Sequence, residues 1–193
     1  MTARTTMATL ITRLRGFAQA GTADYSVSGT TYWTDNQLQD VLDAHRQDVY
    51  RAPMQPVQIY NGGTVEYHDY FSGISNFEAT SGGTSIFYVE DAAGSAVGTA
   101  LYTPDYNRGV VTFAADTGGS AYYLYGRSYD LNAAAAEVWR TKAGQYAMAV
   151  NFSTDNHRID RGKIIENCFA MADHYDRMSG ASDVIILRND NAY

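Results

Sequence analysis

The side chains best suited to catalysis or metal binding in this 193-residue chain are four histidines, one cysteine and 21 acidic residues. His45 lies on the apolar stripe of a predicted helix, where a packed or interface histidine is expected rather than a catalytic one. Glu66 and His68 share one face of a predicted strand, a weak metal signal that an ordinary strand surface explains better. Residues 155–160 resemble a calcium loop without its glycine and terminal glutamate. These patterns predict no metal site.

Nucleophilic chemistry has no clear signature either. Cys168 has Ile164, Ile165, Met171 and Ala172 at helical spacing, and such a core environment raises the pKa of a thiol and keeps it inert. The sequence contains no G-x-S-x-G, P-loop or H-E-x-x-H pattern. A pair of carboxylates of the glycosidase type stays open as an alternative in the acidic middle of the chain. Apart from that alternative, these residue types indicate no catalytic residue, metal site or cofactor.

The apolar content points to burial against other chains. The hydrophobic fraction is 45%, but 26 of these residues are Ala and 16 are Tyr, whereas Leu, Ile, Val and Phe together number 36. That is a thin supply for a self-sufficient core, and the low net charge per residue argues against disorder. Because Tyr is enriched at protein interfaces, the composition favours an ordered chain that completes its burial in an assembly.

The net charge of −7 is concentrated in the middle of the chain. Residues 53–126 contain seven acidic residues and one basic residue, Arg108. An acidic chain is not expected to bind nucleic acid through its overall charge, because the phosphate backbone is also negative. We also expect neither a membrane span nor a secretory signal, since no apolar run has the length or flanks for either.

Three blocks of elements must position these residues. Residues 1–53 are predicted to form two helices, the first over 7–17 and the second capped by Thr34 and Gln37, with its stripe continuing to Val49 and its end at Pro53. Residues 54–126 contain short β-branched and aromatic runs at 57–60, 64–67, 85–89, 110–113 and 121–125, separated by glycine-rich turns. Residues 127–182 are predicted to form two further helices, starting near Asp130 and ending near Gly180.

The fold class expected from this pattern is α+β. Two N-terminal and two C-terminal helices form a four-helix bundle, a small antiparallel β-sandwich or barrel is inserted between them, and an extended C-terminal tail follows. In domain terms, residues 1–53 and 127–182 form the helical domain, 54–126 the inserted β domain, and 183–193 the tail. The helical blocks must pack together because neither can bury its apolar stripe alone.

The helical blocks resemble the head–tail connector (adaptor, or head completion) proteins of tailed bacteriophages. The resemblance is carried by LITRLR at 10–15, WTDNQLQDVLD at 33–43, YDLNAAAAEVW at 129–139, Lys142-Ala143 and NFSTD at 151–155. It implies a ring, usually of twelve copies, that lies beneath the portal protein, joins it to a tail, stopper or nozzle protein, and surrounds the DNA channel without specific DNA binding. It also implies a virion location at the head–tail interface, assembly in the host cytoplasm, no membrane and no enzymatic activity.

Three sets of residues are candidates for contacts in such an assembly. By position, the C-terminal tail matches the segment that docks onto the portal or an adjacent subunit in the family; its residues are Val184, Ile185, Ile186, Leu187, Arg188 and Tyr193. The aliphatic run at 184–187 is expected to add as a strand to a neighbouring protein, with an edge strand packed on its own domain as the alternative. Twelve of the 14 basic residues are Arg, whose planar guanidinium suits protein interfaces, although a codon bias of the genome would explain the count equally well. The possible ring-interface residues are Arg13, Arg15, Arg140, Arg158 and Arg161. A possible acidic lumen or rim comprises Glu66, Asp69, Glu78, Glu90, Asp91, Asp105 and Asp116.

Two alternatives remain open at this stage. The Tyr-rich middle of the chain could bind or hydrolyse a glycan as a virion module, with stacked tyrosines and nearby carboxylates. The chain could also be a tail-completion protein of similar build, which differs from a connector only in its position in the particle.

Overall fold

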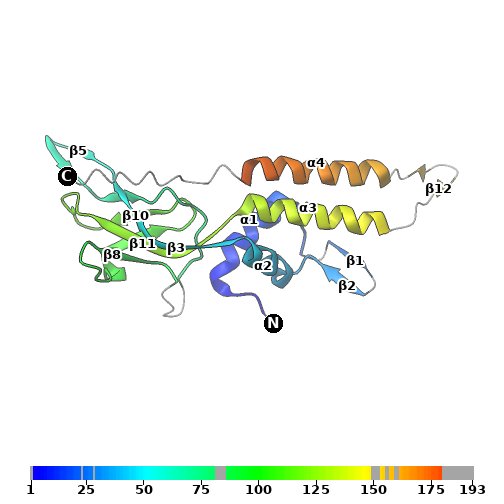
Figure 1. The fold of residues 1–193 in the computed structure, drawn as a ribbon, viewed down its shortest axis with the longest axis horizontal. Helices are drawn as coiled ribbons and strands as arrows, with labels where there is room; N and C mark the ends of the chain where they lie inside the picture. Colours follow the sequence, from blue (N-terminus) through cyan, green and yellow to red (C-terminus); the bar gives the residue numbers. More distant parts are fainter. Residues whose placement is uncertain are drawn as a thin grey trace.

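The computed structural model describes residues 2–22, 24–27, 29–80, 86–148, 153–154, 157–158 and 161–179. It is mixed α+β, as expected, with four α-helices and several antiparallel sheets among these residues. The molecule is elongated, with the helices gathered at one end and the larger sheets at the other (Figure 1). None of the described helices is both long and apolar enough to cross a membrane.

The helical end is built from α1 (Ala8–Ala18), α2 (Asp35–Ala44), α3 (Leu131–Met148) and α4 (Arg161–Ser179), with a 3-10 turn at Thr5–Met7. The predicted capping box is confirmed: the Thr34 side chain accepts from the Gln37 backbone N–H, and the Gln37 side chain accepts from the Thr34 N–H. Leu14, Leu42 and Val138 belong to one core that joins α1, α2 and α3. A short hairpin of β1 (Tyr25–Val27) and β2 (Thr30–Tyr32) precedes α2.

The second helix is shorter than the sequence pattern predicts. It ends at Ala44, and the residues expected to continue it form a strand, β3 (Arg46–Pro53). Its partner is β11 (Tyr122–Tyr129), and the ladder begins where the Asp130 N–H donates to the His45 carbonyl at 3.1 Å. The helical stripe through Val49 was therefore misleading, because Val49 packs against the core of the sheets instead. Long-range pairing has overridden local periodicity here.

Two antiparallel sheets form the other end of the molecule. One has the strand order β3-β11-β8 and the other β4-β7-β10-β9. The remaining strands are β4 (Gln55–Pro56), β7 (Asp69–Phe71), β8 (Tyr88–Asp91), β9 (Tyr102–Asp105) and β10 (Val110–Phe113), with a 3-10 turn at Thr99–Leu101 before β9. Besides β1 and β2, two further hairpins of the described residues lie outside these sheets: β5 (Ile59–Asn61) with β6 (Thr64–Glu66), and β12 (Ser153–Thr154) with β13 (His157–Arg158).

One aromatic core lies between the two sheets. Val89 and Leu124 from the first sheet and Tyr70 and Val111 from the second are fully buried in it. Tyr70 contacts the ring of Phe113 edge-on at a centroid distance of 5.3 Å. Aromatic pairs of this kind add about 0.5–1.5 kcal/mol beyond their area burial. The tyrosines of this region are therefore partly core residues and not only surface residues.

The strand boundaries differ from the predicted runs in several places. The strand at 110–113 is confirmed, whereas only Ile59 and Tyr60 of the run at 57–60 lie in a strand, β5. The runs at 85–89 and 121–125 correspond to strands that begin at Tyr88 and Tyr122. Strands β7 and β9 were not predicted. β11 continues through Gly126 to Tyr129 and leads directly into α3. Together, β3 and β11 connect the helices to the sheets.

Candidate interaction surfaces

A buried ionic cluster joins the N-terminal segment to both halves of the molecule. The Arg4 guanidinium makes a bidentate contact with Asp43 of α2, at 2.6 and 2.9 Å, and its Nε donates to Glu78 Oε1 at 3.1 Å. Glu78 is fully buried and also accepts from Thr6 Oγ1 at 2.6 Å and from the Tyr129 hydroxyl at 2.7 Å. Glu78 was expected among the lumen or rim carboxylates, and its burial corrects that expectation. No single motif marks this cluster in the sequence.

The electrostatics of this cluster are those of a fixed structural contact. Hydrogen bonding to Asp43, opposed in part by desolvation, raises the pKa of Arg4 above its already high value. Burial, followed by the hydrogen bond to Glu78, raises the pKa of the Tyr129 hydroxyl. Both raised pKa values favour the protonated, hydrogen-bonding forms of Arg4 and Tyr129, which suits a cluster that holds segments together.

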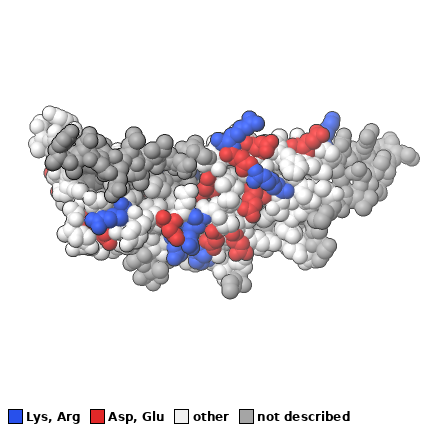
Figure 2. Space-filling view, in the orientation of Figure 1, with Lys and Arg blue, Asp and Glu red and all other residues white. Residues whose placement is uncertain are grey.

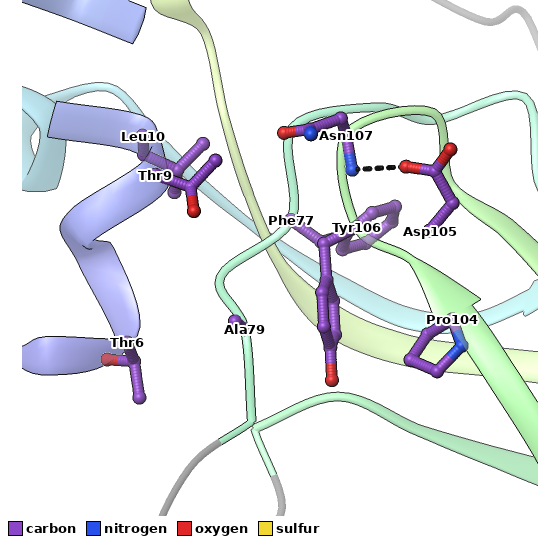
Figure 3. Close-up of a pocket in the computed structure, with 9 residues that line it drawn as sticks. All are labelled: Thr6, Thr9, Leu10, Phe77, Ala79, Pro104, Asp105, Tyr106 and Asn107. Carbon is purple, nitrogen blue, oxygen red and sulfur yellow. Dashed lines mark hydrogen bonds between the residues drawn. The ribbon is translucent and has the colours of Figure 1, made fainter. Parts of the chain in front are cut away.

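A cavity of about 270 Å³ lies beside this cluster, between α1 and the sheets (Figure 3). Its walls include Thr6 and Leu10 on the helical side and Phe77 and Tyr106 on the other. The Asp105 carboxylate that borders the cavity accepts from the Asn107 backbone N–H at 3.0 Å, as the dashed line in Figure 3 shows. The cavity therefore has walls of mixed polarity and a carboxylate engaged in its own turn.

A larger cavity, of about 520 Å³, lies between α3, α4 and the end of α1. Its most unusual residue is Lys142, which is almost completely buried and donates from Nζ to the carbonyls of Ala18 and Gln19 and to the Asp24 carboxylate, at 2.9–3.1 Å. The amine thus satisfies the carbonyl end of α1. Cys168 lines the same cavity, and burial raises the pKa of its thiol, which confirms the expected core environment.

Several of the predicted lumen carboxylates stabilise turns in the sheets. Asp91 accepts from the backbone N–H groups of residues 93 and 95, and Asp105 from those of residues 107 and 108. Asp116 accepts from the N–H groups of Tyr67 and Gly118, and these two bonds hold its pKa below the usual range. Such Asx contacts explain, without any partner, why aspartate accumulates in a turn-rich segment.

The other carboxylates of that set also have partners within the chain. Glu66 contacts His68 at 3.3 Å, Asp69 accepts from Thr112 Oγ1 at 2.6 Å, and Glu90 is hydrogen-bonded to Tyr125. Figure 2 shows Asp and Glu interspersed with Lys and Arg where the helices meet the sheets. A lumen-facing role for the exposed carboxylates stays a prediction.

Two of the histidines, His45 and His68, make pairwise contacts. The pKa of His68 is raised, first by its hydrogen bond to the Phe113 carbonyl and then by Glu66. His45 contacts Glu137 of α3, with 2.7 Å between Nε2 and Oε2. Within the described residues, no group of three or more His, Cys, Asp or Glu side chains could hold a metal ion.

The arginines proposed for a ring interface make contacts inside the chain where their side chains are described. Arg13 donates to Asn76 and Asn107, Arg15 pairs with Asp35 at 2.6 Å, and Arg140 pairs with Asp176 of α4. Arg158 lies in β13 and Arg161 begins α4, but their side chains fall outside the description. The tail residues, including Val184–Leu187, Arg188 and Tyr193, also lie outside the described residues.

The long helix α4 is the most incompletely covered helix of the described chain. It lies antiparallel to α3 at the edge of the molecule (Figure 1), and Tyr175 stacks on Phe17 of α1 at 5.7 Å. Among its described side chains only Cys168 and Ala172 are buried. Phe169 is 49% exposed and Met178 45%. α4 therefore presents apolar side chains that this chain does not cover.

A second incompletely covered element is β3, an eight-residue strand at the end of its sheet. Only Ala52 of its side chains is buried, and Tyr50 is 83% exposed. Tyr50 contacts the ring of Tyr125, which stacks in parallel on Tyr88 at 4.7 Å. Sequence analysis missed this strand because its residues continue a helical stripe.

No family model, curated protein or solved structure matches this chain.

Proposed function

We propose that this chain is a structural virion protein, a head–tail connector whose copies form a ring between the portal and a tail, stopper or nozzle protein. The ring, of about twelve copies by family resemblance, surrounds the channel through which DNA passes without specific binding. The four helices form the connector bundle, the sheets an inserted domain, and residues 183–193 an extended docking tail.

The observation that carries this proposal is the exposed face of α4. Helices in proteins draw most of their stability from packing an apolar face. α4 buries two of its described side chains and leaves Phe169 and Met178 about half exposed. A neighbouring copy would cover this face, and head-to-tail contacts of one surface with a different one close into a ring when the rotation allows. The shortage of large aliphatic residues in the sequence agrees with burial between copies.

The test is the assembly state of the full-length protein. Light scattering after size exclusion, together with negative-stain images, should show a ring, and the protein should co-purify with the portal when the two are co-expressed. Phe169→Glu should dissociate the ring and leave the helix content unchanged. Glu166→Gln, on an exposed position of the same helix, is the matched control and should leave the ring intact. A wild-type protein that stays monomeric at all concentrations would contradict the proposal.

One observation favours the glycan-binding alternative. Tyr50, Tyr125 and Tyr88 form a continuous aromatic group at the sheet end, and Glu90 is hydrogen-bonded to Tyr125. An exposed ring beside a carboxylate is a common surface for stacking a sugar. Binding of a glycan by the full-length protein that Tyr50→Ala abolishes, without ring assembly, would favour this function over the connector. A tail-completion protein would instead form the same ring at another position in the particle.

A further inference from the structure

The ring of His68 lies where the ladder between β7 and β10 ends. The registered pairs of that ladder stop at Asp69 and Thr112, and one further backbone bond runs from the Phe113 N–H to the His68 carbonyl at 2.8 Å. The side chain provides the return contact, because His68 Nδ1 lies 3.2 Å from the Phe113 carbonyl oxygen. The imidazole therefore takes the place of a backbone N–H at the end of this ladder.

The other ring nitrogen of His68 faces the β5–β6 hairpin. Nε2 lies 3.3 Å from Oε2 of Glu66 in β6, and the same carboxylate accepts from Asn61 Nδ2 in β5. The hairpin lies at the sheet end of the molecule (Figure 1). Its two strands pair with each other and, among the described residues, with no strand of the two larger sheets. His68 thus connects the hairpin to the sheet through its two ring nitrogens.

Both contacts of the His68 ring end on oxygen atoms that only accept hydrogen bonds. A backbone carbonyl and a carboxylate have no proton to donate, so each contact requires an N–H on the ring. Neutral imidazole has one N–H, whereas imidazolium has two. The protonated ring therefore satisfies both acceptors, and loss of its proton leaves either the Phe113 carbonyl or the Glu66 carboxylate without this donor.

The charges that face the ring favour its protonated form. Glu66 faces it from β6 and Asp116 from the turn after β10, whereas Asp69 accepts from a threonine hydroxyl of β10. The hydrogen bond to the Phe113 carbonyl, opposed by desolvation and supported by Glu66, raises the pKa of His68 above the ordinary value of 6.5. A raised pKa means that the protonated ring stabilises the fold below the ordinary value, and that this contribution is lost as pH rises through the raised one.

We propose that protonation of His68 latches the β5–β6 hairpin to the end of the β7–β10 ladder and that loss of this proton releases the hairpin. Water takes up the proton, so the step needs no other reactant. All contacts of the latch lie within one chain, so the inference goes beyond the proposed ring and does not depend on it. The hairpin carries two exposed apolar side chains, Ile59 and Tyr60, the second 79% exposed. The latch therefore sets whether these side chains are held in a fixed position.

The test is hydrogen exchange of the full-length protein at about pH 5.5 and about pH 8.5, on either side of the ordinary histidine pKa. Protection factors correct for the intrinsic effect of pH on exchange. For the amides in 59–66 they should fall about two- to tenfold at the higher pH, the net worth of one hydrogen bond. In His68→Gln they should not change between the two pH values, because an amide does not titrate. His174→Gln, at an exposed histidine of α4, is the matched control and should keep the wild-type pH dependence.

Nuclear magnetic resonance of the His68 ring measures its protonation in the wild-type protein. The pKa should lie above 6.5, and Glu66→Gln should lower it, since the amide keeps an acceptor oxygen but removes the charge. The midpoint of the change in hairpin protection should move with the pKa of the ring. The latch is overturned by equal protection at both pH values, by a pH-dependent loss that persists in His68→Gln, or by a His68 pKa at or below 6.5.

Discussion

The buried carboxylate of Glu78 should be the most sensitive single position in the junction between helices and sheets. Glu78→Ala removes the acceptor for three side-chain donors: Arg4, Thr6 and Tyr129. All three bonds end on a carboxylate, and a hydrogen bond to a charged group is worth about 1.5–3 kcal/mol. Removing one partner of a buried ion pair costs about 3–5 kcal/mol in general.

The expected loss of unfolding free energy lies at the lower end of that range because Arg4 keeps a partner for its charge. Arg4 keeps its bidentate contact with Asp43, and its side chain is about a third exposed, so water screens its charge. We therefore expect Glu78→Ala to lower the free energy of unfolding by about 3 kcal/mol. For a chain of this size, that loss corresponds to a melting temperature about 6–12 °C lower.

Thermal and urea unfolding of the full-length protein, followed by circular dichroism, measures this change. The matched control is Arg127→Gln, since Arg127 approaches Glu78 only to 3.8 Å and its side chain is 41% exposed. That variant should lose less than about 1 kcal/mol. If Glu78→Ala costs no more than the control, the cluster does not hold the junction together, and the reasoning above is refuted.

Three further perturbations test other parts of the structure. Lys142→Ala should lower the free energy of unfolding by about 2–4 kcal/mol, because the carbonyls at the end of α1 lose a buried charged donor. Each kcal/mol corresponds to about 2–4 °C in melting temperature, so a value within about 2 °C of wild type would contradict this expectation. Gly126→Ala should lower the free energy of unfolding by about 1–3 kcal/mol, because an added Cβ would lie 2.8 Å from the Phe77 side chain. In the control Gly16→Ala the added Cβ meets nothing within 4 Å, so this variant should be neutral or stabilising. Equal effects of the two variants would show that Phe77 moves aside without a cost in stability. Because the folded-state pKa of Tyr129 is raised, its contribution to stability is complete below the ordinary tyrosine pKa of 10.0 and is lost as pH rises toward the folded-state pKa. Tyr129→Phe should therefore reduce the fall in unfolding free energy above pH 10.0. If wild type and Tyr129→Phe lose stability equally with rising pH, Tyr129 is not the cause of that fall.

Local signals explain which elements could be predicted. The capping box at Thr34 and Gln37 is a short-range contact between residues three apart, so its two residue types are enough to locate it. The strand at Val110–Phe113 has a β-branched and aromatic run between turns, and it forms as expected. The environment of Cys168 also follows from its neighbours at helical spacing. In each case the deciding partners lie within one turn or one run of the chain.

Long-range pairing explains the misses. Residues 46–53 carry a helical stripe, yet they pair with β11, some 75 residues later, and no local pattern contains that partner. Glu78 looked like one more surface carboxylate because its donors at positions 4, 6 and 129 are distant in sequence. The same applies to Lys142, whose acceptors lie at the end of α1.

The sequence by itself determined the class of fold, the helical ends of the chain, the β-rich middle and the location of the negative charge. These properties depend on composition and on periodicity over a few residues. The tertiary structure alone decided which carboxylates are buried or used in turns, that β3 ends its sheet among the described residues, and that α4 presents exposed apolar side chains. Burial and open edges depend on which distant segments meet, and that information is distributed over the whole chain.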